Sequence, residues 1–445
     1  MKKSKASFQL RAGLAALIAA LGLSAAPLQA APPAPQYAFT NGKWWDGKQF
    51  QTRTMYAIDG VLHSSWNGRL DETIDLGGRY VIPPLTEVHA HWIEPKRFDN
   101  FISCYLADGI YYVRDPSSSP YVVNQLRDKV NLPNSVDMVW SLQSFNGPGG
   151  HPSNEYAKLA DYGVIPMAWK NNLDPNILFI VNNKKEIDER IEMLKKERPD
   201  YVKMFLEYSE DYQKRLKDPK TYGERGIDPK LVPYVVKKVH ELGLKVLAHV
   251  YTVGDYRAAL YGGVDEMVHM PGVRYEPGMD KKRFLLTEED ARETKRRGVV
   301  VNPTMAYSYE YIDTNPKYAK LVRDEIFIPN LKLLKDHGVK ILSGSDFYYH
   351  NVTEELARLK GSKLFTDEEL LVMTTRTSSQ AIFPNRKIGQ LDDGYEADFL
   401  VLDRNPAENI DNINSITLRV KQGRRLVLAP EALKRPQKSC VADVY

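Results

Sequence analysis

"VIPPLTEVHAHW", residues 81–92, places two histidines, His89 and His91, at the end of an apolar run. Side chains two positions apart in a β-strand point to the same face of the sheet. If this run is a strand, both imidazoles face the same way and can bind one cation together. The alternative is a half-buried strand whose histidines form hydrogen bonds with carbonyls and water. Further ligand-type residues elsewhere in the chain are needed to choose between the two interpretations.

The same stretch begins a pattern in which short apolar runs alternate with amphipathic segments as far as residue 384. Segments such as 184–197, 228–243 and 287–298 have helical periodicity. Strands that alternate with helices in this number predict an α/β fold, a (β/α)8 TIM barrel, over residues 83–384. A doubly wound open sheet is the alternative, but no glycine-rich phosphate loop follows the first run. The eight runs interpreted as strands are 84–92, 109–115, 136–142, 200–206, 244–250, 264–270, 298–305 and 339–346.

Two of the helical segments carry start signals. Asp228 precedes Pro229, which is typical of an N-cap followed by a proline in the first turn. Thr287 stands three residues before Asp290, a relative of the capping box. We therefore expect helices to begin directly after Asp228 and Thr287.

The two ends of the chain have a different pattern from its middle. Residues 36–82 and 385–430 contain short alternating runs separated by turn motifs such as "DG" and "GG", which are typical of β-hairpins. We expect these two segments to pair into one small composite β-sandwich domain beside the barrel.

Residues 1–30 have the features of a cleavable signal peptide. Four basic residues precede an apolar segment at 12–23, and a small-residue stretch ends near Ala30. No later apolar run approaches the roughly 18 residues that a membrane span needs. The sequence therefore predicts a periplasmic or secreted protein without a membrane span.

Composition narrows the classes of partner. The chain has 61 Lys plus Arg against 57 Asp plus Glu, and four of the basic residues lie in the leader, so the mature chain is formally neutral. No basic patch interleaved with aromatic residues is present, which disfavours nucleic acid as a partner and leaves a small-molecule substrate. A homo-oligomer is compatible with this composition. Cys104 and Cys440 are the two cysteines, and the sequence does not decide whether they pair.

Ligand-type residues also end other predicted strands, where barrel active sites form. His249 and His269 lie near the ends of the fifth and sixth runs, and Asp346 ends the eighth. The fourth run, "DYVKMFL", contains Lys203 among apolar residues. A buried ammonium is costly unless it is paired or neutralised, so this lysine calls for an explanation.

Together these motifs resemble the metal-dependent amidohydrolase superfamily, in its imidazolonepropionase- and prolidase-like branch. The resemblance covers nearly the whole mature chain. The motifs that carry it include "VIPPLTEVHAHW", "GIYYVRD", "GGHP", "YVKMFL", "VLAHVYT", "GVDEMVHM", "NPTM", "ILSGSD" and the closing "IGQLDDGYEADFLVLDRNP".

The resemblance implies a centre with two divalent metal ions. His89, His91 and Asp346 would hold one ion, and His249 and His269 would hold the other. Zn²⁺ suits imidazole and carboxylate ligands best, although Mn²⁺, Fe²⁺ or Co²⁺ could replace it.

Lys203 would bridge the two ions as a carbamate formed with CO₂, which explains a lysine in an apolar strand. The implied nucleophile is a metal-bridging hydroxide that attacks a carbonyl polarised by the ions. Asp346 would act as the catalytic base and return the proton to the leaving amine.

Other residues near the predicted site have two interpretations each. His151 either contacts the substrate or is a histidine in a turn. Tyr251 either contacts the substrate or is a tyrosine of the core. Arg114 and Asp115 end the second run, where we favour an internal ion pair at the barrel rim. The tyrosine-rich segment 305–318 either lines the substrate pocket or packs on the surface.

Four positions depart from the family pattern. Because of them, the resemblance does not decide the fine geometry of the metal site or the substrate, but it still implies the same metal ligands. The four positions are Pro84, Glu87, Pro152 and Ser345.

These implications predict an enzyme, a metal-dependent hydrolase that cleaves an amide-type C–N bond in a dipeptide or an N-acyl amino acid. Cyclic amides, lactones or other esters are alternative substrates for the same centre. A mononuclear deaminase would not need Lys203. A metal-free binding or scaffold barrel is the alternative from another class, but a scaffold has no reason to keep a buried lysine among four histidines.

Overall fold

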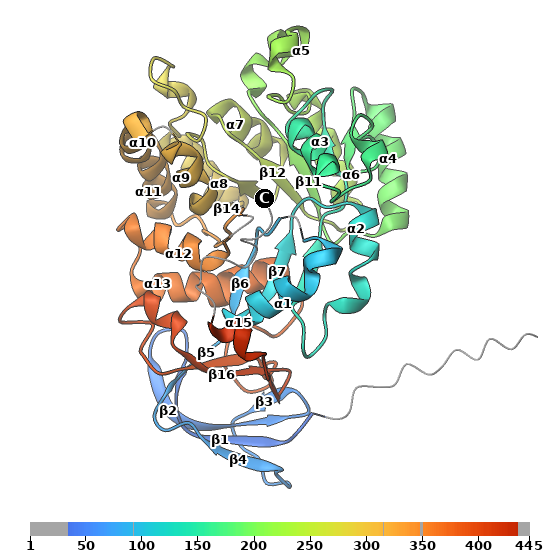
Figure 1. Cartoon of the computed structure of the whole chain (residues 1–445). Coiled ribbons are helices and arrows are strands. Elements are labelled where there is room, and N and C mark those ends of the chain that lie inside the picture. The colour runs from blue at the N-terminus through green and yellow to red at the C-terminus, as the bar shows by residue number, and fades with distance from the viewer. Residues whose placement is uncertain (1–33, 92, 315, 348–349, 435–445) are drawn as a thin grey trace, which may run out of the picture. The chain divides into compact units, whose positions relative to one another are not determined.

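The computed structural model in Figure 1 describes residues 34–434, except 92, 315 and 348–349. The predicted signal peptide and Cys440 lie outside the described residues, so export stays a prediction and the pairing of Cys104 with Cys440 stays open. Within the described part, none of the helices has the length and apolar character that crossing a membrane requires.

Strands from both ends of the chain form one eight-stranded sheet, in the order β17-β16-β15-β5-β1-β2-β3 with β4 paired to β1. The two ends meet where β15 runs antiparallel to β5, with Leu400 opposite Ile82 and Leu402 opposite Tyr80. The strands are β1 (Tyr37–Trp45), β2 (Phe50–Ile58), β3 (Val61–His63), β4 (Glu72–Asp75), β5 (Tyr80–Ile82), β15 (Phe399–Leu402), β16 (Ile416–Lys421) and β17 (Arg424–Arg425).

A small apolar core holds this sheet together. The ring of Phe399 on β15 packs edge-on against Phe39 at 4.9 Å between centroids and lies 5.1 Å from Trp44. Val81 of β5 and Val420 of β16 are buried in the same cluster. The two chain ends therefore combine as expected in one sheet, whereas the sandwich form stays a prediction.

The middle of the chain contributes parallel strands. A three-stranded sheet has the order β6-β7-β8, and a six-stranded sheet has the order β10-β9-β11-β12-β13-β14. All pairs within both sheets are parallel. The strands are β6 (Leu85–Glu87), β7 (Ile110–Asp115), β8 (Asp137–Trp140), β9 (Ser144–Asn146), β10 (Leu178–Ile180), β11 (Val202–Phe205), β12 (Val246–His249), β13 (Glu266–Val268) and β14 (Val300–Asn302).

Seven of the eight predicted runs contain one of these strands. The eighth run, 339–346, contains no regular strand among the described residues and makes a single parallel bridge, from Ile341 to Val301, while Phe347 just after it bridges to Ala90. The segment 339–347 therefore lies between β14 and the residues that follow β6. The mixed α/β arrangement is confirmed, and closure into a barrel stays a prediction.

Helices lie between and around the parallel strands, and Figure 1 shows α6, α7 and α8 near β11, β12 and β14. The helices are α1 (Phe98–Ala107), α2 (Pro120–Asn124), α3 (Ser153–Asp161), α4 (Lys184–Glu197), α5 (Tyr212–Lys217), α6 (Val232–His240), α7 (Val253–Gly262), α8 (Glu288–Arg297), α9 (Met305–Asp313), α10 (Pro316–Val322), α11 (Ile328–Asp336), α12 (Val352–Gly361), α13 (Asp367–Val372), α14 (Ser378–Ile382) and α15 (Pro430–Lys434).

The two predicted helix starts are confirmed. Thr287 and Asp290 form a capping box at the start of α8, which ends at Gly298 in the left-handed conformation with φ +71°. Asp228 accepts a hydrogen bond from the backbone N–H of Lys230 in the short turn that leads into α6.

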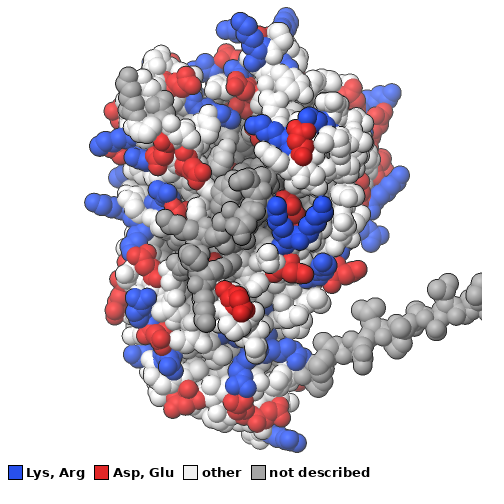
Figure 2. Space-filling model, viewed as in Figure 1, with Lys and Arg blue, Asp and Glu red and all other residues white. Residues whose placement is uncertain are grey.

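The viewed face in Figure 2 carries Lys and Arg side chains interspersed with Asp and Glu. This mixture agrees with the near-neutral composition. The expectation that nucleic acid is not a partner stays a prediction.

Candidate metal centre

All eight predicted site residues line one small cavity of about 60 Å³. They come from strands that are far apart in the sequence, or from the residues just after those strands. Parallel strands bring their carboxyl ends to the same side, so side chains at these positions meet. The eight are His89, His91, His151, Lys203, His249, Tyr251, His269 and Asp346.

One group of three has the spacing of metal ligands. The Nε2 atoms of His89 and His91 lie 3.0 Å apart, and Asp346 Oδ1 lies 3.2 Å from the first and 3.0 Å from the second. One ligand atom from each of the three residues lies within 4.8 Å of the others. A single cation could therefore contact all three.

Glu87 fixes the two segments that carry this group. Its Oε1 accepts hydrogen bonds from the N–H of His89 at 2.8 Å and of Ser345 at 3.0 Å. Its Oε2 accepts one from the Ser345 hydroxyl at 2.7 Å. Burial raises the pKa of this carboxyl to about 7. Glu87 and Ser345, two of the positions that depart from the family pattern, thus bind each other directly.

Three residues around the cavity have left-handed backbone conformations that non-glycine residues rarely adopt. They are His269 with φ 71°, Thr304 with φ 46° and Asp346 with φ 53°. Such conformations cost about 1–3 kcal/mol each and persist where surrounding contacts impose them. His269 follows β13 and Thr304 follows β14, whereas Asp346 ends a run without a regular strand. His269 and Asp346 line the cavity, and the Thr304 hydroxyl contacts His269.

His249 and His269 form the second pair, with ring centroids 4.5 Å apart. Nδ1 of His269 contacts the Thr304 hydroxyl at 2.6 Å, and its Nε2 lies 3.6 Å from Asp346 Oδ2. Nε2 of His249 is buried and has no hydrogen-bond partner among the described residues. An unpartnered buried imidazole nitrogen facing this donor set fits a metal ligand.

Lys203 is 1% exposed, and its Nζ lies 5.5 Å from the centroid of the Phe205 ring. Within the described part of the chain it forms no ion pair. Burial lowers the pKa of this amine to about 7. A substantial fraction is therefore neutral near pH 7, and a neutral amine is the form that reacts with CO₂.

The protonation states also suit a metal. Burial holds the pKa of His89 and of His249 well below the usual range, so both rings are neutral. Burial opposes ionisation of Asp346, but the interactions with His89, His91 and His269 together outweigh it and keep that carboxyl pKa well below its usual range. Neutral imidazoles and an ionised carboxylate are the forms that bind divalent ions.

His151 and Tyr251 lie on the side of His249. The rings of His151 and His249 stack with centroids 4.8 Å apart, and the Tyr251 ring lies 4.2 Å from His249. The loop that carries His151 is anchored, because its N–H donates to the carbonyl of Arg225 and its carbonyl accepts from the Asn146 amide. Both residues are therefore placed to contact a substrate.

Tyr307 lines the cavity, which is one of the two interpretations given for the tyrosine-rich segment. Glu155, Glu207 and Arg274 were not predicted from the sequence, and Glu155 also lines the cavity. Glu207 and Arg274 lie next to residues that line the cavity, and neither belongs to a recognised motif. Glu207 directly follows an apolar run, and a charged residue at such a position is a signal that sequence analysis could use. Glu207 is 1% exposed, and burial raises the pKa of its carboxyl to about 8.

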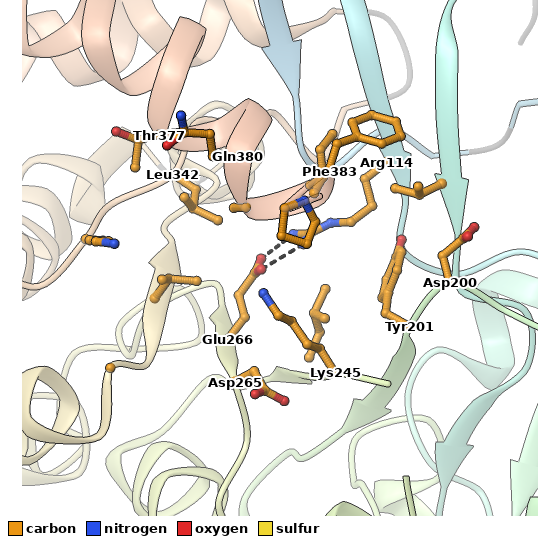
Figure 3. Close-up of a pocket in the computed structure, with 18 of the residues that line it drawn as sticks. Arg114, Asp200, Tyr201, Lys245, Asp265, Glu266, Leu342, Thr377, Gln380 and Phe383 are labelled. Carbon is orange, nitrogen blue, oxygen red and sulfur yellow. Dashed lines mark hydrogen bonds and ion pairs between the residues drawn. The ribbon is translucent and has the colours of Figure 1, made fainter. Parts of the chain in front are cut away.

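The expected ion pair between Arg114 and Asp115 is wrong. Arg114 instead forms a two-pronged ion pair with Glu266 of β13, with one contact of 2.7 Å, and both side chains are 4% exposed. Figure 3 shows the two side chains pointing toward each other. Asp115 accepts a hydrogen bond from the N–H of Ser117. The real partner lies 152 positions along the chain, which local spacing does not reveal.

The Arg114–Glu266 pair borders a larger cavity of about 1190 Å³ at the opposite ends of the strands. Lys245 and Asp265 lie at the starts of β12 and β13 there (Figure 3). The predicted ligands line the smaller cavity. Size therefore does not identify the candidate site, whereas the convergence of ligand-type side chains does.

Comparisons with known proteins bear on the family and the fold of the chain. The model of the amidohydrolase family matches residues 163–427. No curated protein sequence matches the chain. Among solved structures, an amidohydrolase superposes with a TM-score of 0.68 at 19% identity, covering 89% of this chain and 100% of that one.

Two further solved structures are similar in fold. A Xaa-Pro dipeptidase with bound methionine in its active site has a TM-score of 0.66 at 18% identity and covers 88% of this chain and 99% of that one. Molinate hydrolase has a TM-score of 0.69 at 15% identity, with coverages of 91% and 98%. At these identities the similarity supports a TIM-barrel-like α/β fold.

Proposed function

Since the chain belongs to the amidohydrolase family, we propose that it is a binuclear metal-dependent hydrolase that cleaves the amide bond of a dipeptide or an N-acyl amino acid. Membership of this family makes it an enzyme that hydrolyses carbon–nitrogen bonds. The observation that carries the finer proposal is the meeting of four histidines, a buried lysine and a carboxylate in one cavity.

The described residues fit the implied ions. His89, His91 and Asp346 would hold one ion, and His249 and His269 the other. Lys203, as a carbamate, would supply oxygen ligands to both. Divalent ions at this position, most suitably Zn²⁺, would lower the pKa of water and polarise the carbonyl of the substrate.

The side chains of the chain itself handle protons and orientation. Asp346, with both oxygens directed at histidine nitrogens, would take the proton of the attacking water on a carboxylate oxygen and transfer it to the leaving nitrogen as the C–N bond breaks. His151 and Tyr251 would hold the carbonyl or carboxylate of the substrate, because both line the cavity beside His249. The low exposure of these groups excludes bulk water and strengthens their electrostatic effect.

The names of the structural neighbours favour two classes of substrate. The Xaa-Pro dipeptidase supports a dipeptide. Molinate hydrolase supports the alternative of another amide, a cyclic amide or an ester at the same centre. A metal-free scaffold barrel is disfavoured by the unpartnered Nε2 of His249, because a scaffold gains nothing from it.

Metal content tests the proposal directly. Protein purified from metal-supplemented medium containing bicarbonate should hold about two transition-metal ions per chain by elemental analysis, because the cavity has two groups of ligands. Chelation should remove the activity. A stoichiometry near one would favour the mononuclear alternative, and one near zero would contradict the proposal. A screen of dipeptides and N-acyl amino acids then identifies the substrate.

We further propose that the protein is exported after cleavage of residues 1–30. The basic start and the apolar segment at 12–23 support this. Mass spectrometry of protein recovered from the periplasm or the medium should give an N-terminus near residue 31. An intact N-terminus on cytoplasmic protein would contradict it.

A further inference from the structure

Two carboxyl groups flank His151, whose ring stacks on His249. Nδ1 of His151 lies 3.9 Å from Glu155 Oε2 and 3.9 Å from Glu207 Oε2. Both distances exceed a hydrogen bond. The His151 side chain is 10% exposed, it lines the cavity, and its Nδ1 has no hydrogen-bond partner among the described residues.

Glu155 is the carboxylate that reaches the cavity. It lies in the first turn of α3 and lines the cavity, and its side chain is 40% exposed. Its Oε2 is nevertheless buried and has no hydrogen-bond partner in the described part of the chain. One end of the carboxylate thus faces the interior and the other can be reached by a ligand.

Glu207 is the second carboxyl group beside His151. Neither of its carboxyl oxygens has a hydrogen-bond partner among the described residues, and its side chain is 1% exposed. The nearby cation is Arg274, whose Nε forms a long ion pair of 3.9 Å with Glu207 Oε1. Nη1 of Arg274 donates to the Tyr311 hydroxyl at 2.6 Å, and its guanidinium lies over the ring of Tyr251.

The chemistry of the two carboxyl groups defines which kind of ligand they would bind. An ionised carboxylate only accepts hydrogen bonds, so its ligand must donate. A buried carboxylate without a partner is costly, and a cation relieves that cost. An ammonium group offers three donors and one positive charge in a small volume, which suits a cavity of about 60 Å³.

We propose that Glu155 binds the free α-ammonium group of the substrate, with the buried Glu207 carboxyl as a second oxygen acceptor beside His151. This inference rests on the proposed function, because the metal ligands of the same cavity would place the scissile carbonyl. It selects dipeptides with a free amino terminus over N-acyl amino acids, cyclic amides and esters, none of which presents an ammonium group at that point.

The test compares alanyl, leucyl and methionyl dipeptides with their N-acetyl derivatives on metal-loaded enzyme. Wild-type enzyme should prefer the free dipeptides at least tenfold in kcat/KM. Glu155→Gln should lose that preference, with kcat/KM for free dipeptides falling about 10- to 100-fold, as expected for loss of a hydrogen bond to a charged group. Activity on the N-acetyl derivatives should stay within about twofold. Glu289→Gln, in the exposed first turn of α8, is the matched control and should change neither.

A charge reversal keeps the test decisive if Glu155→Gln is unstable. Glu155→Lys should turn the preference toward substrates with an N-succinyl group, whose carboxylate would face the new ammonium. Thermal melting shows whether each variant is folded.

Binding separates failure of this inference from failure of the proposed function. Calorimetry on metal-loaded Asp346→Asn should show free dipeptides binding more tightly than N-acetyl dipeptides. If wild type binds metal and cleaves both forms equally, or if Glu155→Gln affects both equally, the ammonium site is wrong and the hydrolase stands. If wild type neither binds nor cleaves either form, the proposed function itself is wrong and the inference falls with it.

Discussion

Lys203 and Asp346 lie beside the same histidines, yet they would contribute differently to a metal centre. Lys203 is a buried amine on β11 that would become an oxygen ligand only as a carbamate formed with CO₂. Asp346 is an anion already, held ionised by His89 and its neighbours. Substitutions at the two positions should therefore separate metal binding from proton transfer.

Lys203→Ala should lose most of the bound metal and most of the activity. Changes to groups that merely orient ligands cost about 10- to 100-fold in metal affinity or activity, so loss of a bridging ligand should cost about 100-fold or more. Acetate, which can enter the space left by the side chain, should partly restore both. Elemental analysis and kcat measured with and without acetate provide the check. Unchanged metal content in Lys203→Ala would rule out the carbamate.

Asp346→Asn should behave in the opposite way. The amide oxygen can still coordinate, but the side chain cannot accept a proton, so most of the metal should remain while kcat falls. Loss of a general base costs about 10²–10⁴-fold, or about 3–5 kcal/mol of barrier. Metal content and kcat measured on the same preparation decide the matter. Near-full kcat would exclude the proton-transfer role even if the metal site is present.

At the residue scale, strand ends and spacing were enough to predict which side chains meet. His89, His249 and His269 each lie at or just after the end of an apolar run, and these ends converge in the structure. Glu207 was not predicted although it directly follows an apolar run, because a single charged residue there does not show what it faces. Arg274 was not predicted, because its place depends on the conformation of the loop after β13.

At the element scale, the Arg114–Glu266 pair ties β7 to β13 beneath the candidate site. Arg114 also donates from Nε to the carbonyl of Val88 at 2.8 Å, the residue before His89. The pair therefore supports the backbone that presents the first histidine. Removing one partner leaves the other charged and buried, which typically costs 3–5 kcal/mol, whereas replacing both by apolar residues often costs little.

Arg114→Met should lower the free energy of unfolding by about 3–5 kcal/mol, because the Glu266 carboxylate then stays buried without its partner. The double variant Arg114→Met/Glu266→Leu should recover most of that loss. Denaturant unfolding of the two singles and the double, with metal content held equal, gives the coupling energy. Additive effects of the two substitutions would show that the pair does not act as a unit.

Helices and strands were predictable from the sequence where the interactions that specify them join residues close together in the chain. The capping box of Thr287 and Asp290 spans three residues, and it was predictable because all its atoms are local. The segment 339–346 was predicted as a strand from its apolar character, but it makes a single bridge. β9 and β10 have three residues each and were not predicted. The other three-residue strands of the parallel sheets, β6, β13 and β14, were predicted because each lies inside one of the longer runs.

At the scale of the whole molecule, the C-terminal strands connect to the N-terminal strands and to the parallel sheets. Lys421 of β16 forms a buried ion pair of 2.7 Å with Asp137 of β8. The Tyr112 hydroxyl of β7 donates to Asp398, just before β15, at 2.7 Å. The joining of both chain ends was predictable from their hairpin patterns. These polar links were not, because each joins residues more than 280 positions apart.

Removing residues 388–445 should therefore leave a protein that is insoluble or unfolded. The deletion exposes the edge of β5, where β15 pairs, and takes away the burial of Phe399, Val401 and Val420. A large apolar side chain contributes about 1.5–3 kcal/mol when buried, so these three alone approach the 5–15 kcal/mol that stabilises a typical domain. It also leaves Tyr112 without its acceptor, while Arg386 remains to pair with Asp137 at 2.8 Å. A chain that ends at residue 434 keeps all of these contacts and is the matched control, expected to stay soluble and folded. Soluble yield, thermal melting and metal content of the two truncations are the measurements. If the chain ending at 387 were soluble, bound metal and kept full activity, the composite sheet would be an appendage rather than a part of the stable fold.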